Sequence, residues 1–373
     1  MVQIQVQAEK LNKRKVIPGF LPDPDNIAGV VFKNKIIEAE EIIDVPNPGL
    51  GKWYKDRDGY FYWGGGVKEI DFFAVKTSSE QTPYPWWLKN AFYSIPDLWA
   101  GEDMPKVTIA ILDTGITEHI DFDFNKIAGF NYIDKTTDYK TDSVGHGTHL
   151  AGIIAAKGIK SSGIIPGVNL FIAKVCDNSG TPSLDAVKNA LNDILNNLNG
   201  ASGIDVINMS FNLAARNNDT EQKLLEDITT LLKRISQEQC VLVSACGDED
   251  WEFENFPACL DECISVGSID QGFKRSSFST KSLTLDIMSP GENIISSMAF
   301  DSTIIKNGTS QSSAIISAIC ALGIRELKRK GEKNTILLKK ALFQTAINNS
   351  FSMNEYGHGI CNPNNFIKTI KSV

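Results

Sequence analysis

Two short motifs place an acidic and a basic side chain beside small residues. Asp113 begins an Asp-Thr-Gly sequence at the end of an apolar run, and the carboxyl ends of parallel strands are where α/β proteins build their sites. Alone, this motif is more often structural, because Asp and Gly are common in turns. His146 lies between Gly145 and Gly147, which leaves its imidazole accessible to a bound molecule. His149 follows three residues later, but without an HExxH motif the pair does not indicate zinc, and we expect His149 to be structural.

A third motif ends in a hydroxyl. Ser310 closes the sequence Asn-Gly-Thr-Ser, immediately before a long apolar stretch that predicts a helix. The amino terminus of a helix carries exposed N–H groups and a partial positive charge, which stabilise negative charge developing on a serine oxygen. An ordinary N-cap is the alternative, since Ser and Thr are preferred at that position. Each of the three motifs is a weak indication of function by itself, and only their combination can indicate a particular chemistry.

Asp113, His146 and Ser310 occur in the chain order Asp, His, Ser, which is the order of the subtilisin triad. In this combination the sequence resembles the subtilase family of serine proteases. The likeness continues in order along the chain, through the segments 207–210, 256–258, 264–267, 288–291, 294–297 and 356–359.

The resemblance implies a fold and a reaction. The fold is α/β, with a subtilisin-like parallel sheet flanked by helices. The reaction is that of a serine endopeptidase on a protein or peptide substrate: His146 takes the proton of Ser310, Ser310 attacks the carbonyl, and Asp113 orients the imidazole. Water then hydrolyses the acyl-enzyme. The substrate is expected to bind as an extended strand. The expected contacts are Ser210, Phe211 and Asn212, then Ala245, Cys246 and Gly247, and the region 180–183.

Some positions depart from the family pattern. Asp248 stands where relatives present an Asn amide to the oxyanion. An ionised carboxylate there repels the developing charge, whereas a protonated one can donate a hydrogen bond. Asn212 replaces a Gly and is expected to narrow the primary pocket. The segment 157–162 occupies a loop in which many relatives bind calcium, but it lacks carboxylate and Asn ligands. We therefore predict no strong calcium site, no other metal and no cofactor.

Two alternative functions do not include protease activity. Asp248 and Asn212 motivate a catalytically weakened subtilase-fold protein that binds a peptide strand and does not cut it. The aromatic residues near the amino terminus motivate a wall-binding adaptor. Retention of all three residues of the Asp-His-Ser set favours the protease over both alternatives.

The elements that must position these groups follow from apolar patterning. Short apolar runs predict buried parallel strands at 107–112, 169–175, 206–209, 241–245 and 263–267. Apolar spacings of three and four predict helices at 146–156, 183–198, 221–236 and 309–329. Alternation of the two patterns is typical of an α/β domain.

The first part of the chain has another pattern. Residues 1–76 contain short alternating runs broken by Pro and Gly, which predict a small mainly-β domain, followed by a linker at 77–85 and the peptidase domain at 86–373. The aromatic segment around Asp58–Gly59 resembles small bacterial barrels of Src-homology type. Its aromatic residues, Trp53, Tyr54, Tyr60, Tyr62 and Trp63, form either a small core or a surface that binds a peptide, a glycan or the catalytic domain.

Composition excludes some classes of function. The chain has 373 residues and a net charge of −8, which argues against nucleic acid because phosphate binding needs a basic surface. No apolar stretch is long enough to span a membrane, and the first residues lack the apolar core of a secretion signal. Seven cysteines without a CxxC pair indicate reduced thiols, although Cys259 and Cys263 could bridge in an oxidising compartment. We expect a cytoplasmic location.

Overall fold

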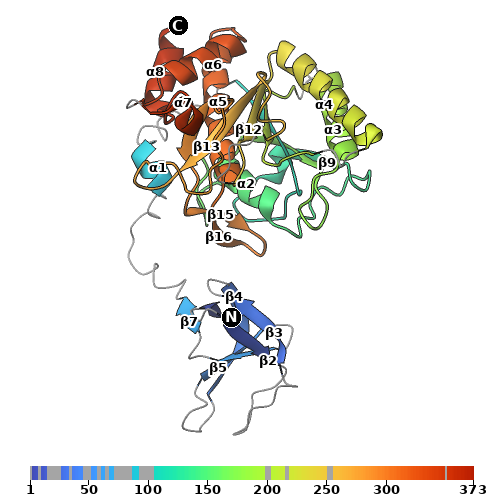
Figure 1. Cartoon of the computed structure of the whole chain (residues 1–373), viewed down its shortest axis with the longest axis vertical. Coiled ribbons are helices and arrows are strands. Elements are labelled where there is room, and N and C mark those ends of the chain that lie inside the picture. Colours follow the sequence, from blue (N-terminus) through green and yellow to red (C-terminus); the bar gives the residue numbers. More distant parts are fainter. Residues whose placement is uncertain are drawn as a thin grey trace. The chain divides into compact units, whose positions relative to one another are not determined.

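The chain forms two compact units, Met1–Gln81 and Thr82–Val373, each with its own large sheet (Figure 1). The computed structural model describes residues 2–6, 10–14, 27–32, 36–44, 52–56, 60–63, 67–70, 86–91, 105–197, 203–214, 218–249, 255–348 and 351–373.

The second unit is built on a parallel sheet of seven strands, in the order β14-β13-β12-β11-β8-β10-β9. The strands are β8 (Thr108–Asp113), β9 (Ile127–Asn131), β10 (Asn169–Lys174), β11 (Val206–Met209), β12 (Val241–Ala245), β13 (Cys263–Ile269) and β14 (Ile287–Pro290). The five predicted strands are confirmed with ends within two residues. The central strands are buried on both faces, as expected for a parallel sheet covered by helices.

The helices of the second unit are α1 (Trp86–Ala91), α2 (His146–Ala155), α3 (Leu184–Asn197), α4 (Asp219–Gln237), α5 (Thr309–Arg329), α6 (Thr335–Gln344), α7 (Met353–Tyr356) and α8 (Pro363–Ser372), with a 3-10 turn at Phe124–Lys126. The four predicted helices are α2 to α5, with ends shifted by at most two residues. Asn side chains cap α4, α6 and α8 by accepting backbone N–H bonds.

Two apolar cores lie on opposite faces of the sheet. Side chains of a strand point alternately to its two faces, so Ile109 and Ile111 of β8 join the core formed with α2, α5, α6 and α8. Ala110 and Leu112 join the other core, with α3 and α4, which run beside each other at one side of the sheet (Figure 1). The predicted α/β fold, a parallel sheet flanked by helices, is therefore confirmed.

Two further elements complete this unit. Trp87 of α1 is fully buried in the core shared with α5, and the indole N–H of Trp86 donates to the Glu292 carbonyl (3.1 Å). An antiparallel hairpin, β15 (Ile294–Met298) with β16 (Ser302–Lys306), leads directly into α5. The hairpin thereby sets the position of the first turn of that helix, which contains Ser310.

The described residues of the first unit form a sheet of seven strands in the order β3-β2-β6-β5-β4-β1-β7. They are β1 (Val2–Val6), β2 (Lys10–Arg14), β3 (Ile27–Phe32), β4 (Ile36–Asp44), β5 (Lys52–Asp56), β6 (Phe61–Trp63) and β7 (Val67–Ile70). Trp53, Tyr54 and Tyr62 are buried on the paired strands β5 and β6, where Tyr54 lies opposite Tyr62. The predicted turn at Asp58–Gly59 and the linker at 77–85 lie outside the described residues.

Two features of the described residues concern membrane-spanning helices and the state of the cysteines. Among the described residues, no helix is both long and apolar enough to cross a membrane. All seven cysteines fall in the described part of the chain and all are free thiols, Cys259 and Cys263 included.

Candidate active site

Asp113 is the last residue of β8, and its carboxylate is buried at the carboxyl end of the parallel strands. The side chain is 1% exposed, and its Oδ1 accepts hydrogen bonds from His146 Nδ1 (2.8 Å) and from the Thr114 N–H (2.8 Å). A buried carboxylate needs such partners, since an unpaired charge in the interior is strongly destabilising. The structure therefore brings together two of the three residues that the motifs single out, 33 positions apart in the chain.

The turn after Asp113 is held by a buried lysine. Lys174 lies opposite Asp113 on the neighbouring strand β10, and its ammonium donates to the carbonyls of Thr114 (2.7 Å) and Thr141 (3.0 Å). Thr114 belongs to the Asp-Thr-Gly motif, and Thr141 lies five residues before His146. Lys174 was not predicted from the sequence, where a lysine at the end of a mostly apolar strand was the only signal.

Two glycines allow His146 to approach this turn. Gly145 has a φ of +73°, a conformation that side chains rarely adopt, and a Cβ there would lie 2.2 Å from the Met298 side chain. At Gly147 a Cβ would lie 2.2 Å from the Gly115 carbonyl oxygen. Close packing of α2 against the turn after β8 therefore requires glycine at 147, whereas the positive φ favours glycine at 145.

Asp142 fixes the start of α2. Its carboxylate accepts hydrogen bonds from the N–H of Gly145 (2.7 Å), the N–H of Thr148 (2.9 Å) and the Thr148 hydroxyl (2.6 Å). Burial disfavours the charge of Asp142, but these bonds outweigh burial and lower its pKa. Asp142 was missed in the sequence, because it lies three residues before the N-cap Gly145, where the usual capping pattern does not apply.

His146 gains proton affinity from its neighbours. Burial disfavours the imidazolium, but the charge and hydrogen bond of Asp113 outweigh burial and raise the pKa of His146 above its ordinary value. Two other charges act on the same pKa: Lys306 lowers it and Asp142 raises it. His149 is different, because it is fully buried and its Nε2 bonds the carbonyl oxygens of Ile294 and Ile304 (both 3.1 Å). Burial lowers the pKa of His149 to about 3, in keeping with a structural residue.

Ser310 lies in the first turn of α5, beside the end of β11. Its hydroxyl donates to the Ser210 carbonyl (3.3 Å), and the Ser210 hydroxyl in turn bonds the Ser310 carbonyl (3.3 Å). Strand β11 pairs with β8 so that Met209 lies opposite Leu112. Ser210 directly follows Met209 in the chain, and Asp113 directly follows Leu112. Among the described hydrogen bonds none joins Ser310 to His146. A serine hydroxyl turns about one torsion, and such bonds often tighten only when substrate binds.

Asp248 lies at the amino end of α5 as well. Its Oδ1 accepts hydrogen bonds from both the N–H of Thr309 (2.7 Å) and the Thr309 hydroxyl (2.8 Å). Its Oδ2 lies beside Gly308, where an added Cβ would be 2.8 Å away. The Gly247 N–H donates to the Thr309 hydroxyl oxygen (3.2 Å). This network ties the segment after β12 to the residue that precedes Ser310.

A cavity of about 340 Å³ opens beside the imidazole. It is lined by Asp113, Thr114, Val144, His146, Cys176, Gly180, Pro182, Ser210, Phe211, Asn212 and Lys306. The cavity therefore gathers the segment Ser210–Asn212 and part of the region 180–183, the two edges expected to hold an extended substrate. Ser310, Asp248 and the segment 245–247 do not line it.

The segment Ala245–Gly247 begins with the last residue of the buried strand β12. The Cys246 thiol is buried against Ser279 and Thr280, and burial raises its pKa to about 12. Any contact of Cys246 with a substrate would therefore come from its backbone. The Asn212 side chain accepts a hydrogen bond from the Phe256 N–H (3.2 Å), which orients this side chain toward Phe256.

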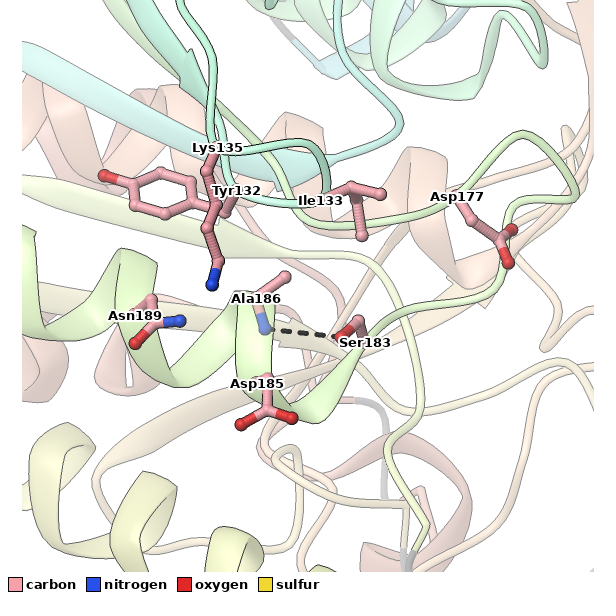
Figure 2. Close-up of a pocket in the computed structure, with 8 residues that line it drawn as sticks. All are labelled: Tyr132, Ile133, Lys135, Asp177, Ser183, Asp185, Ala186 and Asn189. Carbon is pink, nitrogen blue, oxygen red and sulfur yellow. Dashed lines mark hydrogen bonds between the residues drawn. The ribbon is translucent and has the colours of Figure 1, made fainter.

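A second cavity, of about 470 Å³, lies between the 132–135 loop and the start of α3. Figure 2 shows Lys135 and Asn189 at one end and Asp177 at the other, with the Ala186 N–H bonded to the Ser183 hydroxyl (3.3 Å). None of the residues predicted for catalysis lines it, so we place the candidate site at the smaller cavity.

The 157–162 loop closes around a carboxylate. Asp121 is fully buried and accepts hydrogen bonds from the N–H groups of Ile159 (2.7 Å), Lys160 (3.0 Å) and Ser161 (2.8 Å). Within the described ranges, no group of three or more His, Cys, Asp or Glu side chains is arranged to hold a metal ion. The backbone amides of this loop thus satisfy the acidic side chain directly.

Comparison with known proteins gives consistent matches. The family model described as "Subtilase family" matches residues 105–359. Subtilisin DY of Bacillus licheniformis is 30% identical over 263 residues, covering 69% of this chain and 89% of that protein. Thermophilic serine proteinase of Bacillus sp. (strain AK1) is 28% identical over 350 residues, covering 92% of this chain and 80% of that protein.

Two further matches cover less of the relative or have lower sequence identity. Thermostable alkaline protease of Halalkalibacterium halodurans is 31% identical over 217 residues, covering 57% of this chain and 55% of that protein, so the chain spans about half the length of that relative. A solved structure described as "Crystal Structure of a Lanthipeptide Protease" has a TM-score of 0.66 at 20% identity, covering 77% of this chain and 94% of that chain. That likeness shows the fold.

Proposed function

The chain belongs to the subtilase family, and on that basis we propose that it is a serine endopeptidase with Ser310 as nucleophile, His146 as general base and Asp113 as the orienting carboxylate. The observation that carries the proposal is the 2.8 Å bond between Asp113 and His146, beside the cavity that Ser210 shares with them. Ser310 bonds that same Ser210. The names of the protease relatives add support.

The proposed reaction uses these side chains in two half-reactions. The Ser310 oxygen attacks the peptide carbonyl carbon while His146 Nε2 takes the hydroxyl proton, and the imidazolium is stabilised by Asp113. Collapse of the tetrahedral intermediate breaks the C–N bond, and the imidazolium returns its proton to the leaving amine. Water then attacks the Ser310 ester with His146 again as base, which releases the acid and regenerates the hydroxyl.

We propose that the oxyanion forms at the amino end of α5. The Ser310 N–H and the partial positive charge of the helix support negative charge there. Asp248 is the second candidate donor. Because its Oδ1 is occupied by Thr309, only a proton on Oδ2 would let this carboxyl donate.

The proposed substrate is an extended peptide. Strand β11 leads into Ser210–Asn212, and Gly180 and Pro182 of the region 180–183 form the other wall of the cavity. Backbone groups of the two walls would pair with the peptide from both sides, as in strand addition to a sheet edge. Ala245, Cys246 and Gly247, at the end of the next strand, are proposed to contact the peptide through their backbone.

The test is cleavage of a peptide library, read by mass spectrometry, by the full chain and by Ser310→Ala. We expect specific cuts with the first protein and none with the second. Cuts that persist in Ser310→Ala would contradict the assignment of the nucleophile.

Asp248 favours one other function. A carboxylate beside the nucleophile repels an oxyanion when ionised, which suits a subtilase-fold protein that binds peptides and cuts them slowly or not at all. In the library experiment such a protein would retain peptides without producing fragments.

A further inference from the structure

Lys306 places a positive charge on the wall of the candidate active-site cavity. It is the last residue of β16, four positions before Ser310, and it lines the cavity together with His146 and Phe211. Its ammonium donates to the carbonyl oxygen of Gly145 (3.3 Å), the residue directly before His146. Among the lining residues that the structure describes, only His146 and Lys306 can carry a positive charge.

The protein itself leaves this ammonium only partly satisfied. An ammonium has three N–H donors, and the bond to Gly145 is the one hydrogen bond of Lys306 in the described part of the chain; no described ion pair includes it. Lys174 offers a contrast, since its ammonium donates to two carbonyls at 2.7 and 3.0 Å. Lys174 is buried and Lys306 is half-buried, so only Lys306 faces the cavity with donors to spare.

The acidic residues near Lys306 are engaged elsewhere. Asp113 binds His146, and Asp142 binds the amino end of α2. Both act on Lys306 through their charge, but burial outweighs them and lowers its pKa. A partly desolvated cation without a close anion is unfavourable, and a carboxylate from a ligand would supply the missing partner.

We propose that Lys306 makes this cavity a recognition site for an acidic side chain, Asp or Glu, of the peptide substrate, close to the bond that is cut. The proposal rests on the proposed function and specifies its substrate class. The apolar residues Val144, Pro182 and Phe211 line the same cavity and would contact the methylene groups of the acidic residue. A basic side chain would be excluded by charge repulsion.

The experiment compares two peptides that differ only as Glu against Gln at the site of preference found in the library. The full chain should cleave the Glu peptide with a kcat/KM roughly tenfold or more higher, because a hydrogen bond between two charged groups has about that effect. In Lys306→Met the two peptides should be cleaved equally. Lys306→Arg should keep the preference, and Lys340→Met, which removes an exposed lysine on α6, should leave it unchanged.

Binding of the same two peptides is measured with Ser310→Ala and with Ser310→Ala/Lys306→Met. This arm separates the two proposals: if the chain cuts nothing, the Glu and Gln peptides are based on those that Ser310→Ala retains from the library, and their binding still tests Lys306. Tighter binding of the Glu peptide that disappears with Lys306→Met supports recognition of an acidic side chain. Equal cleavage and equal binding of Glu and Gln peptides by the chain with Lys306 intact would overturn it, as would a preference that Lys306→Met leaves in place. Dependence on a free carboxyl terminus would also overturn it, and amidated peptides serve as that comparison.

Discussion

The carboxylate of Asp248 is bonded through one oxygen to both the N–H and the hydroxyl of Thr309, at 2.7 and 2.8 Å. Thr309 is the residue before the proposed nucleophile, so Asp248 holds the turn that presents Ser310. This relationship gives Asp248 a positioning role whether or not it also faces the oxyanion.

The substitution Asp248→Asn separates these two roles. Its carbonyl oxygen can keep both bonds to Thr309, while its NH₂ group would replace Oδ2 and offer donors. If the position faces the oxyanion, kcat should rise by on the order of tenfold to 10², because an amide stabilises the charge that a carboxylate repels. Steady-state kinetics across pH measure this.

Asp248→Ala serves as the comparison, since it removes the bonds to Thr309 as well. We expect that variant to lose activity. An unchanged kcat and an unchanged pH profile in Asp248→Asn would mean that the side chain only positions Thr309.

A second prediction concerns pH. Catalysis needs neutral His146, and Asp113 raises the pKa of this imidazole above 6.5, so kcat/KM should fall as the pH drops through that raised value. Lys306 lowers the pKa of His146 and Asp142 raises it. Lys306→Met should therefore move the acid limb of the profile to higher pH. A shift to lower pH, or an equal shift in Lys340→Met, would contradict this assignment of charges.

A third prediction concerns the 157–162 loop, for which the absence of a strong calcium site stays a prediction. Asp121 accepts three backbone N–H bonds there. We expect a chelator to leave the melting temperature unchanged. Asp121→Asn should lower the free energy of unfolding by about 2–4 kcal/mol, because an amide nitrogen would face N–H donors. Denaturant unfolding measures this loss.

Asp123→Asn is the matched control for the loop variant, because Asp123 is half-buried nearby and accepts a single N–H bond. Its stability should change little. A large drop in melting temperature on chelation would show that calcium contributes.

A fourth prediction concerns the domain boundary. A chain that begins at Thr82, the first residue of the second unit, should fold and keep its peptidase activity. A chain that begins at Pro105, where the family match starts, lacks the fully buried Trp87 and should be less stable by about 3–5 kcal/mol. Thermal unfolding of both proteins provides the measurement. Equal stability of the two would show that α1 is dispensable.

Much of the fold follows from local patterns. The strands of the parallel sheet with uninterrupted apolar runs, such as Val206–Met209 and Val241–Ala245, were predictable because burial on both faces leaves a plain signal. The edge strands β9 and β14 were not predicted: β9 contains Gly129 and one exposed position, and β14 ends in a proline, which weakens the apolar pattern.

The site was predictable only in part. Asp113, His146 and Ser310 stand out because each lies within one residue of the end of an element and within two residues of a glycine. The contacts of Lys174, Lys306 and Asp248 depend on how distant strands and the β15–β16 hairpin pack, and no spacing in the sequence carries that information. Partners that lie far apart in the chain become visible only once the sheet is assembled.

The most direct test of the central claim is labelling of the folded chain by an alkyl fluorophosphonate, with the modified residue identified by peptide mass spectrometry. Such a reagent reacts with a serine only when a neighbouring base activates it. We predict one label, on Ser310, that is absent in Ser310→Ala and strongly reduced in His146→Ala. No label on Ser310 in the folded protein, or equal labelling after the loss of His146, would contradict the assignment of Ser310 as a nucleophile activated by His146.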